Sequence, residues 1–248
     1  MWEIPLLNTV ILLSSGVCLK WNESCLDILM YSNVLLPFTA PRTLSMKRIG
    51  PHNYDVLSLL FGSMLGDASM EKDGNGSRFA FYQEKINGEH LLGIHTFLAD
   101  RGYCLRTEPK VFTKLTKGGK VRSLYRFRTF TYSSFNSIYE LFYINGSKVV
   151  PAVIADYLSP IALAVWIMDD GCKASSGLKI ATNSFTLQEV KFLCKVLNDK
   201  YQIEAKPHSA GVPNQYVIYI NRKSIDKLAK LVKPYIHPSI IYKLKNYL

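Results

Sequence analysis

Two long apolar stretches, about one hundred residues apart, dominate the hydrophobic pattern of the chain. Residues 60–68 read LFGSMLGDA, and residues 163–171 read LAVWIMDDG. Each stretch has the uncharged character of a buried helix, and each ends on an acid, Asp67 or Asp170. The C-terminal end of a helix carries partial negative charge, so a carboxylate there is disfavoured. Two such ends in one chain predict a site in which a positive group lies between the acids.

The pattern around the first stretch predicts a helix, a strand, a helix, a hairpin and a helix. Asn53 can cap the helix that runs into the first apolar stretch. His95 falls on the apolar side of the next helix, where we expect a core histidine rather than a ligand. The predicted elements are a strand over 78–83, a helix over 89–101, strands over 110–116 and 120–131, and a helix over 133–143.

The same order recurs after Ser159-Pro160, a pair typical of a helix start. Identity between the halves is low, so the repeat is one of order and spacing. We therefore predict an α+β protein with two pseudo-symmetric helix-strand-helix-strand-strand-helix halves, at 47–151 and 152–248. The elements expected in the second half are 161–170, 178–183, 186–200, 203–208, 215–221, 223–231 and 239–244.

Residues 1–46 differ from the rest and are expected to lie outside this fold. Residues 4–17 are uncharged, but they are too short and too polar at their ends for a spanning helix. They also lack the basic start of a secretory or transit peptide. The sequence IPLLNTVILLSSG resembles a segment of cytochrome oxidase subunit III. That resemblance implies an upstream exon fused in frame to an intron-encoded protein, and hence a mitochondrial gene.

The charge balance predicts an anionic partner. The formal net charge is +11, and residues 1–46 hold two basic and three acidic residues, so the remainder carries +12. Nucleic acid is the leading partner and an anionic membrane surface the second. Five cysteines without a C-x-x-C pair predict neither a disulfide framework nor a zinc site.

The predicted hairpin concentrates this charge. Eight basic residues and one acid lie between Arg106 and Arg128. Period two places Arg122, Arg126 and Arg128 on one face of the second strand. A two-stranded basic ribbon fits the major groove of DNA, whereas a solvated sheet face, the alternative, usually mixes charges of both signs.

This arrangement resembles the LAGLIDADG homing endonucleases, in particular their single-chain, two-repeat (I-SceI-like) branch. The resemblance covers about residues 50–248 and rests on LFGSMLGDASM, LAVWIMDDGCK and LVKPYIHPSIIYKL. The chain departs from the usual pattern at Ala68 and Cys172. Val165 and Trp166 stand where the first motif has Gly62 and Ser63, so the helix pair cannot be symmetric and the target should be at most an imperfect palindrome.

The resemblance implies a composite active site. The two motif helices would pack side by side, and Asp67 and Asp170 would hold two or more divalent cations, Mg²⁺ by default, with the backbone carbonyls of Gly66 and Asp169. By position in the family, Lys148 and Lys243 would stabilise the charged transition state or tune the attacking water. Asp169 and Asp170 are adjacent, and the motif register selects Asp170 as the side-chain ligand.

The resemblance further implies saddle-shaped antiparallel sheets that lie in the major groove of double-stranded DNA. We expect a monomer in the mitochondrial matrix that makes a staggered double-strand break in a long target at the intron-insertion site. The alternatives are an RNA maturase that assists splicing of its own intron, a protein with both activities, and a DNA-binding module without activity. A membrane-bound protein is a further alternative, although we expect no stable membrane association. The expected DNA contacts are Arg78, Gln83, Lys110, Lys114, Lys120, Arg122, Arg126, Arg128, Lys179, Asn183, Lys206, His208 and Gln215.

Overall fold

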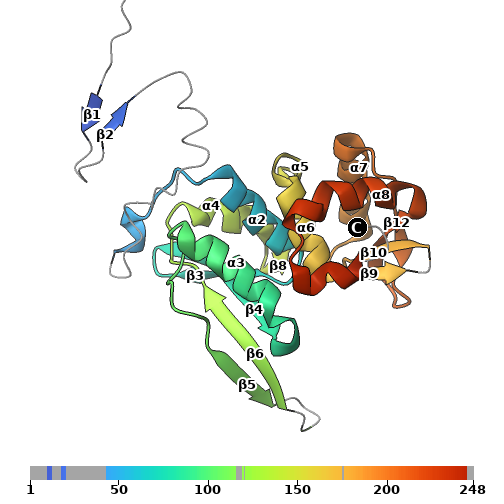
Figure 1. Ribbon diagram of the computed structural model, residues 1–248, viewed down its shortest axis with the longest axis horizontal. Helices are drawn as coiled ribbons and strands as arrows, with labels where there is room; N and C mark the ends of the chain where they lie inside the picture. Colours follow the sequence, from blue (N-terminus) through green and yellow to red (C-terminus); the bar gives the residue numbers. More distant parts are fainter. Residues whose placement is uncertain are drawn as a thin grey trace, which may run out of the picture. The chain divides into compact units, whose positions relative to one another are not determined.

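A computed structural model of the chain describes residues 10–12, 18–20, 43–115, 119, 121–174 and 176–244 (Figure 1). Contacts divide the chain into two units, residues 1–34 and 35–248. In the first unit, β1 (Val10–Leu12) pairs with β2 (Cys18–Lys20) in antiparallel fashion. The remainder of the leader that resembles an oxidase exon lies outside the described residues. The second unit holds both predicted halves.

The first half is built on one antiparallel sheet, in the strand order β3-β4-β6-β5. The helices over residues 88–100 and 135–142 pack on this sheet because their apolar sides need a partner. Its elements are α2 (Tyr54–Leu65), β3 (Ser69–Asp73), β4 (Gly76–Glu84), α3 (Gly88–Asp100), β5 (Val111–Leu115), β6 (Val121–Arg128) and α4 (Phe135–Phe142), with short 3-10 helices η1 (Ser45–Lys47) and η2 (Lys85–Asn87).

The second half repeats this topology, since its sheet has the order β9-β10-β12-β11. The α+β class and the two antiparallel sheets are thereby confirmed. Its elements are α6 (Pro160–Asp170), β9 (Gly171–Ala174), β10 (Gly177–Ala181), α7 (Leu187–Tyr201), β11 (Ala205–Ser209), β12 (Tyr216–Asn221), α8 (Arg222–Val232), η3 (Lys233–Tyr235) and η4 (Pro238–Lys243). The hairpin β7 (Tyr143–Ile144) and β8 (Ser147–Lys148) and the short α5 (Ile154–Tyr157) join the halves.

The predicted order of elements was wrong in one respect: each half contains one more strand. β3 and β9 follow directly after the motif helices and pair with β4 and β10. They are short and carry charged residues, Glu71, Lys72 and Asp73 in β3, so no apolar alternation marks them. The segment 239–244 was also wrongly predicted as an α-helix, because it forms the 3-10 helix η4.

The predicted helix starts are confirmed. The Asn53 side chain accepts from the backbone of Asp55, and the Ser159 side chain accepts from that of Ala162. At α7, Thr186 and Glu189 form a reciprocal capping box.

The two motif helices, α2 and α6, make the most extensive helix–helix contact among the described residues and lie side by side in Figure 1. Their approach depends on Gly62, where a Cβ would lie only 2.3 Å from the carbonyl oxygen of Ala162. Trp166, which stands at the position in the second motif that Ser63 has in the first, is fully buried. No helix among the described residues is both long and apolar enough to cross a membrane.

Candidate active site and nucleic-acid interface

The two motif helices end differently beside one another. α2 ends at Leu65, so Asp67 lies beyond the helix, whereas α6 continues through Asp170. The backbone N–H of Asp67 donates to Asp169 Oδ2 at 3.4 Å. A Cβ on Gly66 would lie 2.5 Å from that same oxygen, so only glycine leaves room for the Asp169 carboxylate. The ends of the two halves thus interlock at the acids.

The two candidate acids in the second motif have different surroundings. The Asp169 side chain is 7% exposed, and its Oδ1 lies 3.0 Å from Nε2 of His90, a buried residue of α3. Among the described residues, the Asp170 carboxylate has no hydrogen-bond partner. Asp169 therefore serves a contact within the protein, while Asp170 keeps its oxygens free.

Two lysines approach the helix ends from the closing segments of the halves. Lys148 Nζ, from β8, donates to the carbonyl oxygens of Gly66 and Ala68 at 3.1 and 2.8 Å. Lys243 Nζ, from η4, donates to those of Met168 and Asp169 at 2.6 and 3.0 Å. Each half thus places one ammonium group at the carbonyl end of its own motif helix, where partial negative charge accumulates.

Charges of both signs crowd this site and shift one another's pKa. Burial, then the charge of Asp169, raises the pKa of Asp67. Burial, then the charges of Asp67 and Asp169, raises the pKa of Asp170 to about 7. Burial lowers the pKa of Lys148 to about 8 and also lowers the pKa of Lys243. A carboxylate pair that resists ionisation in this way favours a bound cation.

Gln83, expected on the DNA face of its strand, lies instead beside the acids. With its amide nitrogen turned toward the carboxylate, Gln83 donates to Asp67 Oδ2 at 3.0 Å. Period two along β4 places Gln83 on the side of Phe79 and Phe81, opposite Arg78. Gln83 and His90 also line a small crevice next to Asp67.

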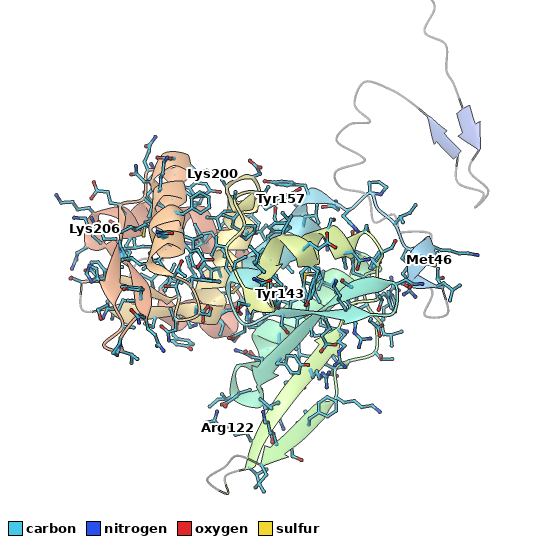
Figure 2. The ribbon with its side chains drawn as sticks, turned by 180° about the vertical axis from the view of Figure 1, so that it is seen from behind. Met46, Arg122, Tyr143, Tyr157, Lys200 and Lys206 are labelled. Atoms are coloured by element: carbon cyan, nitrogen blue, oxygen red, sulfur yellow. The ribbon has the colours of Figure 1, made fainter. Side chains whose placement is uncertain are left out.

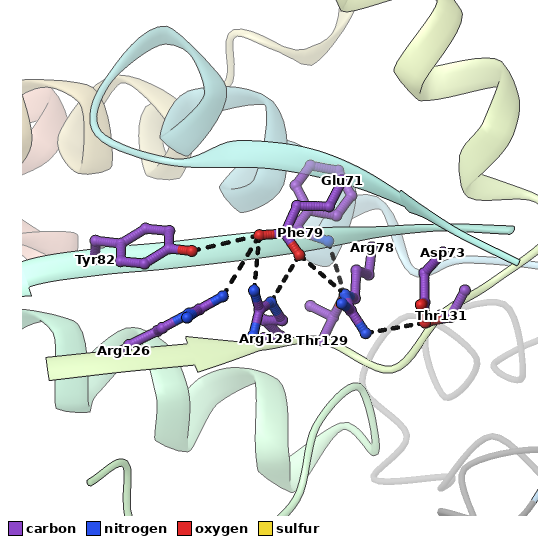
Figure 3. A network of polar contacts seen from close by, with 9 residues as sticks. All are labelled: Glu71, Asp73, Arg78, Phe79, Tyr82, Arg126, Arg128, Thr129 and Thr131. Carbon is purple, nitrogen blue, oxygen red and sulfur yellow. Dashed lines mark hydrogen bonds and ion pairs between the residues drawn. The ribbon is translucent and has the colours of Figure 1, made fainter. Parts of the chain in front are cut away.

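The basic face of the first sheet is paired internally. Glu71, from β3, accepts from Arg78 and Arg128 at 3.2 and 2.7 Å and lies 3.6 Å from Arg126 (Figure 3). Asp73 accepts from Arg78 at 2.9 Å. The sequence predicted the shared arginine face but missed its acids, because they lie on the strand that showed no apolar alternation.

The other predicted DNA contacts are spread over both sheets. Arg122 forms an ion pair with Glu84 at 2.7 Å, and Lys110 and Lys114 are exposed. Lys120 lies outside the described residues. In the second half, the His208 ring stacks on Tyr219 with ring centroids 4.8 Å apart. Figure 2 labels one basic residue on each sheet, Arg122 and Lys206. Of the DNA contacts predicted in the second half, Lys179, Asn183, Lys206 and His208 are exposed and Gln215 is half-buried.

Paired motif helices with clustered acids at their ends, set between two sheets of the same topology, define the class of two-repeat homing endonucleases. The chain belongs to the LAGLIDADG DNA endonuclease family, whose sequence profile it matches over residues 57–228. Both the predicted family and the endonuclease class are confirmed by this match.

Similar proteins carry two kinds of name. The cytochrome b mRNA maturases bI2 of Debaryomyces hansenii and Saccharomyces cerevisiae are 48% and 46% identical over 200 and 209 residues, which is 80% and 81% of this chain. The match covers 76% of the first and only 49% of the second. The intron-encoded endonuclease ai4 of Dictyostelium discoideum is 41% identical over 155 residues, 61% of this chain and 98% of that protein.

A solved structure has the same fold. The homing endonuclease I-WcaI, bound to its DNA recognition sequence, superposes with a TM-score of 0.69 and 25% identity, over 79% of this chain and 88% of that one.

Proposed function

We propose that this protein makes a metal-dependent, staggered double-strand break in DNA at an intron-insertion site. The observation that carries the proposal is the composite cluster of Asp67, Asp169 and Asp170 at the adjoining ends of α2 and α6, flanked by Lys148 and Lys243. A DNA-binding module without activity would have no need to gather acids and ammonium groups at one place. The relative named as an intron-encoded endonuclease, ai4, supports the same activity.

The donor set suits a hard divalent cation. Asp67 and Asp170 would hold Mg²⁺ ions by their side chains, and the carbonyl groups of Gly66 and Asp169 are available beside them. Bound Mg²⁺ would supply an activated water and charge stabilisation at the scissile phosphate. Lys148 and Lys243 would hold the helix ends and place positive charge next to the phosphate. The engagement of Asp169 by His90 supports Asp170 as the second side-chain ligand.

The DNA would lie across the two sheets. Both halves belong to one chain, so a monomer offers both acids and both surfaces. The predicted contacts divide into paired arginines on the first sheet, such as Arg126 and Arg128, and exposed residues on the second, such as Lys179 and Lys206. The mitochondrial matrix as the compartment, and the exon origin of residues 1–46, rest on the resemblance of the leader to an oxidase subunit.

Cleavage of a defined duplex tests the proposal. The purified full chain is incubated with Mg²⁺ and a duplex that carries the intronless oxidase exon junction, and the products are resolved by strand. Asp67→Asn and Asp170→Asn should each abolish double-strand cutting while the duplex is still bound. Absence of any cut by the wild-type protein would contradict the proposal. Normal cutting by Asp170→Asn together with loss in Asp169→Asn would assign the metal ligand to Asp169.

A second activity is favoured by the names of the two maturases described above, which are 48% and 46% identical. An RNA maturase would use the basic surface to bind its own intron. The same preparation, tested for binding of intron RNA and for stimulation of splicing in vitro, measures this activity. Tight RNA binding without DNA cleavage would identify a maturase alone, whereas both signals would identify a protein with two activities.

A further inference from the structure

The first acid lacks the backbone support that the second acid has. Asp170 is the last residue of α6, and the N–H of Gly171 after it still donates to the carbonyl oxygen of Ile167. Asp67 follows the end of α2 by two residues. The N–H groups of Gly66 and Ala68 on either side of it share one acceptor, the carbonyl oxygen of Ser63. The N–H of Asp67 therefore needs an acceptor from elsewhere.

That acceptor comes from the other half of the protein. Asp169 Oδ2 receives the N–H of Asp67 at 3.4 Å, and Asp169 Oδ1 lies 3.0 Å from His90 Nε2. His90 and Asp169 are 3% and 7% exposed, so neither side chain can swing into solvent without opening the interface. A buried carboxylate that accepts from two donors is held in one orientation.

The chain of contacts from His90 through Asp169 to Asp67 has no equivalent that runs from the first motif to Asp170. The residue of the first motif that corresponds to Asp169 is Gly66, which carries no side chain to reach Asp170. The space that a side chain at Gly66 would need is filled by the Asp169 carboxylate itself, 2.5 Å from the position of a Cβ. The first motif ends on Gly66-Asp67 and the second on Asp169-Asp170. The two ends therefore differ in a complementary way, because the Asp169 carboxylate fills the space that Gly66 leaves open.

We infer that His90, through Asp169, is a positioning residue for Asp67 and so controls the cutting of one DNA strand more than the other. The inference rests on the proposed endonuclease activity, in which each acid serves one strand. Among the described residues no hydrogen bond joins His90 directly to Asp67. His90 fixes the carboxylate that fixes the backbone of Asp67, and a small displacement of a metal-binding acid lowers the rate of the step that depends on it.

The test separates the two strand cuts. A supercoiled plasmid that carries the target is converted first to a nicked circle and then to a linear form, and end-labelled duplexes identify the strand. In single-turnover reactions with Mg²⁺, His90→Ala should lower the cleavage rate of one strand at least about 10-fold relative to that of the other strand. The nicked circle should therefore accumulate. Binding of the duplex in EDTA should change less than about twofold, because His90 is buried away from solvent.

Four further variants distinguish positioning from general destabilisation. His90→Gln keeps an amide donor and should restore the wild-type strand ratio. Asp169→Asn should slow cleavage of the same strand as His90→Ala does. The variant with both substitutions should change the ratio of the two strand-cleavage rates no more than the more severe single substitution. His95→Gln is the matched control: His95 lies on the same helix, is equally buried and donates to the Leu105 carbonyl at 2.8 Å, away from the acids. It should lower stability without altering the strand ratio.

Each outcome decides the inference. Equal slowing of both strands by His90→Ala, or a shifted ratio in His95→Gln, would overturn it. If His90→Ala does not fold, the Asp169→Asn strand ratio decides alone, and an unchanged ratio overturns it. A wild-type protein that cuts neither strand contradicts the proposed function instead.

Discussion

Replacement of Gly62 by alanine should separate the motif helices and damage both stability and cleavage. A Cβ at this position would lie 2.3 Å from the carbonyl oxygen of Ala162 and 2.7 Å from its Cα. Both atoms belong to the backbone of α6, so no side-chain rotation relieves the contact. The helices would have to move apart by about 1 Å to restore an ordinary van der Waals separation.

The expected magnitude is a balance of two effects. Overpacking of a tight interface costs about 1–3 kcal/mol, and a backbone contact belongs at the upper end of that range. Alanine gains about 1 kcal/mol over glycine in a helix interior. The net loss of about 2 kcal/mol should lower Tm by roughly 4–8 °C for a chain of this size. Cleavage should slow more than about 10-fold, because Asp67 follows the helix that moves.

Gly93→Ala supplies the matched control, measured by thermal denaturation under the same conditions. Gly93 also lies inside a helix, α3, but its added Cβ would meet only the edge of the His237 ring, at 3.2 Å. That side chain can give way, so Gly93→Ala should leave Tm unchanged or raise it by up to about 3 °C. If the two variants shifted Tm equally, the close backbone approach of α2 and α6 would be refuted.

Three other contacts can each be tested by one substitution. Burial lowers the pKa of His52 to about 4, and the unfolded state, with a pKa of about 6.5, therefore binds the proton first as the pH falls. In urea titrations the wild type should lose about 2 kcal/mol more of its unfolding free energy between pH 7 and pH 5 than His52→Gln does, and an equal change in the two proteins would contradict this cause. Glu71→Gln should free arginine charge and steepen the slope of log K against log[salt] for DNA by about 1 in anisotropy titrations; an unchanged slope would mean that these arginines do not reach phosphates. Thr186→Ala removes the cap of α7 and should cost about 1 kcal/mol in thermal denaturation, with cleavage at 25 °C unaffected; full wild-type stability would show that the cap contributes nothing.

Local signals in the sequence predicted most of the fold. The caps at Asn53 and Ser159, the two apolar motif helices and the basic hairpin depend on neighbouring residues, so a single sequence carries them. β3 and β9 were missed because they owe their extended form to pairing with the next strand rather than to their own composition.

The site residues that occupy fixed positions relative to the two motifs could be predicted from the sequence. The residues that reach the site only through tertiary contacts could not. The lysines expected near the acids, Lys148 and Lys243, do lie at the motif helix ends, although their chemical roles remain predictions. His90 carries no signal in the sequence, because its partner Asp169 is 79 residues away and belongs to the other half. The free basic face expected on the hairpin was likewise altered by Glu71 from a distant strand.

Helix electrostatics disfavours carboxylates at the two motif helix ends. The two lysines offset part of this cost without any metal. Lys243 donates to the last carbonyl groups of α6, and Lys148 donates to carbonyl groups just beyond the end of α2, which lowers the cost of negative charge at both ends. The lysines therefore stabilise the helix ends. Burial, and then the neighbouring carboxylates, raises the pKa of Asp67 and Asp170, so these two carboxyl groups are the ones that a bound cation would stabilise. Each half thus carries its own acid and its own lysine, while Asp169, which contacts both His90 and the backbone of Asp67, joins the two sets asymmetrically.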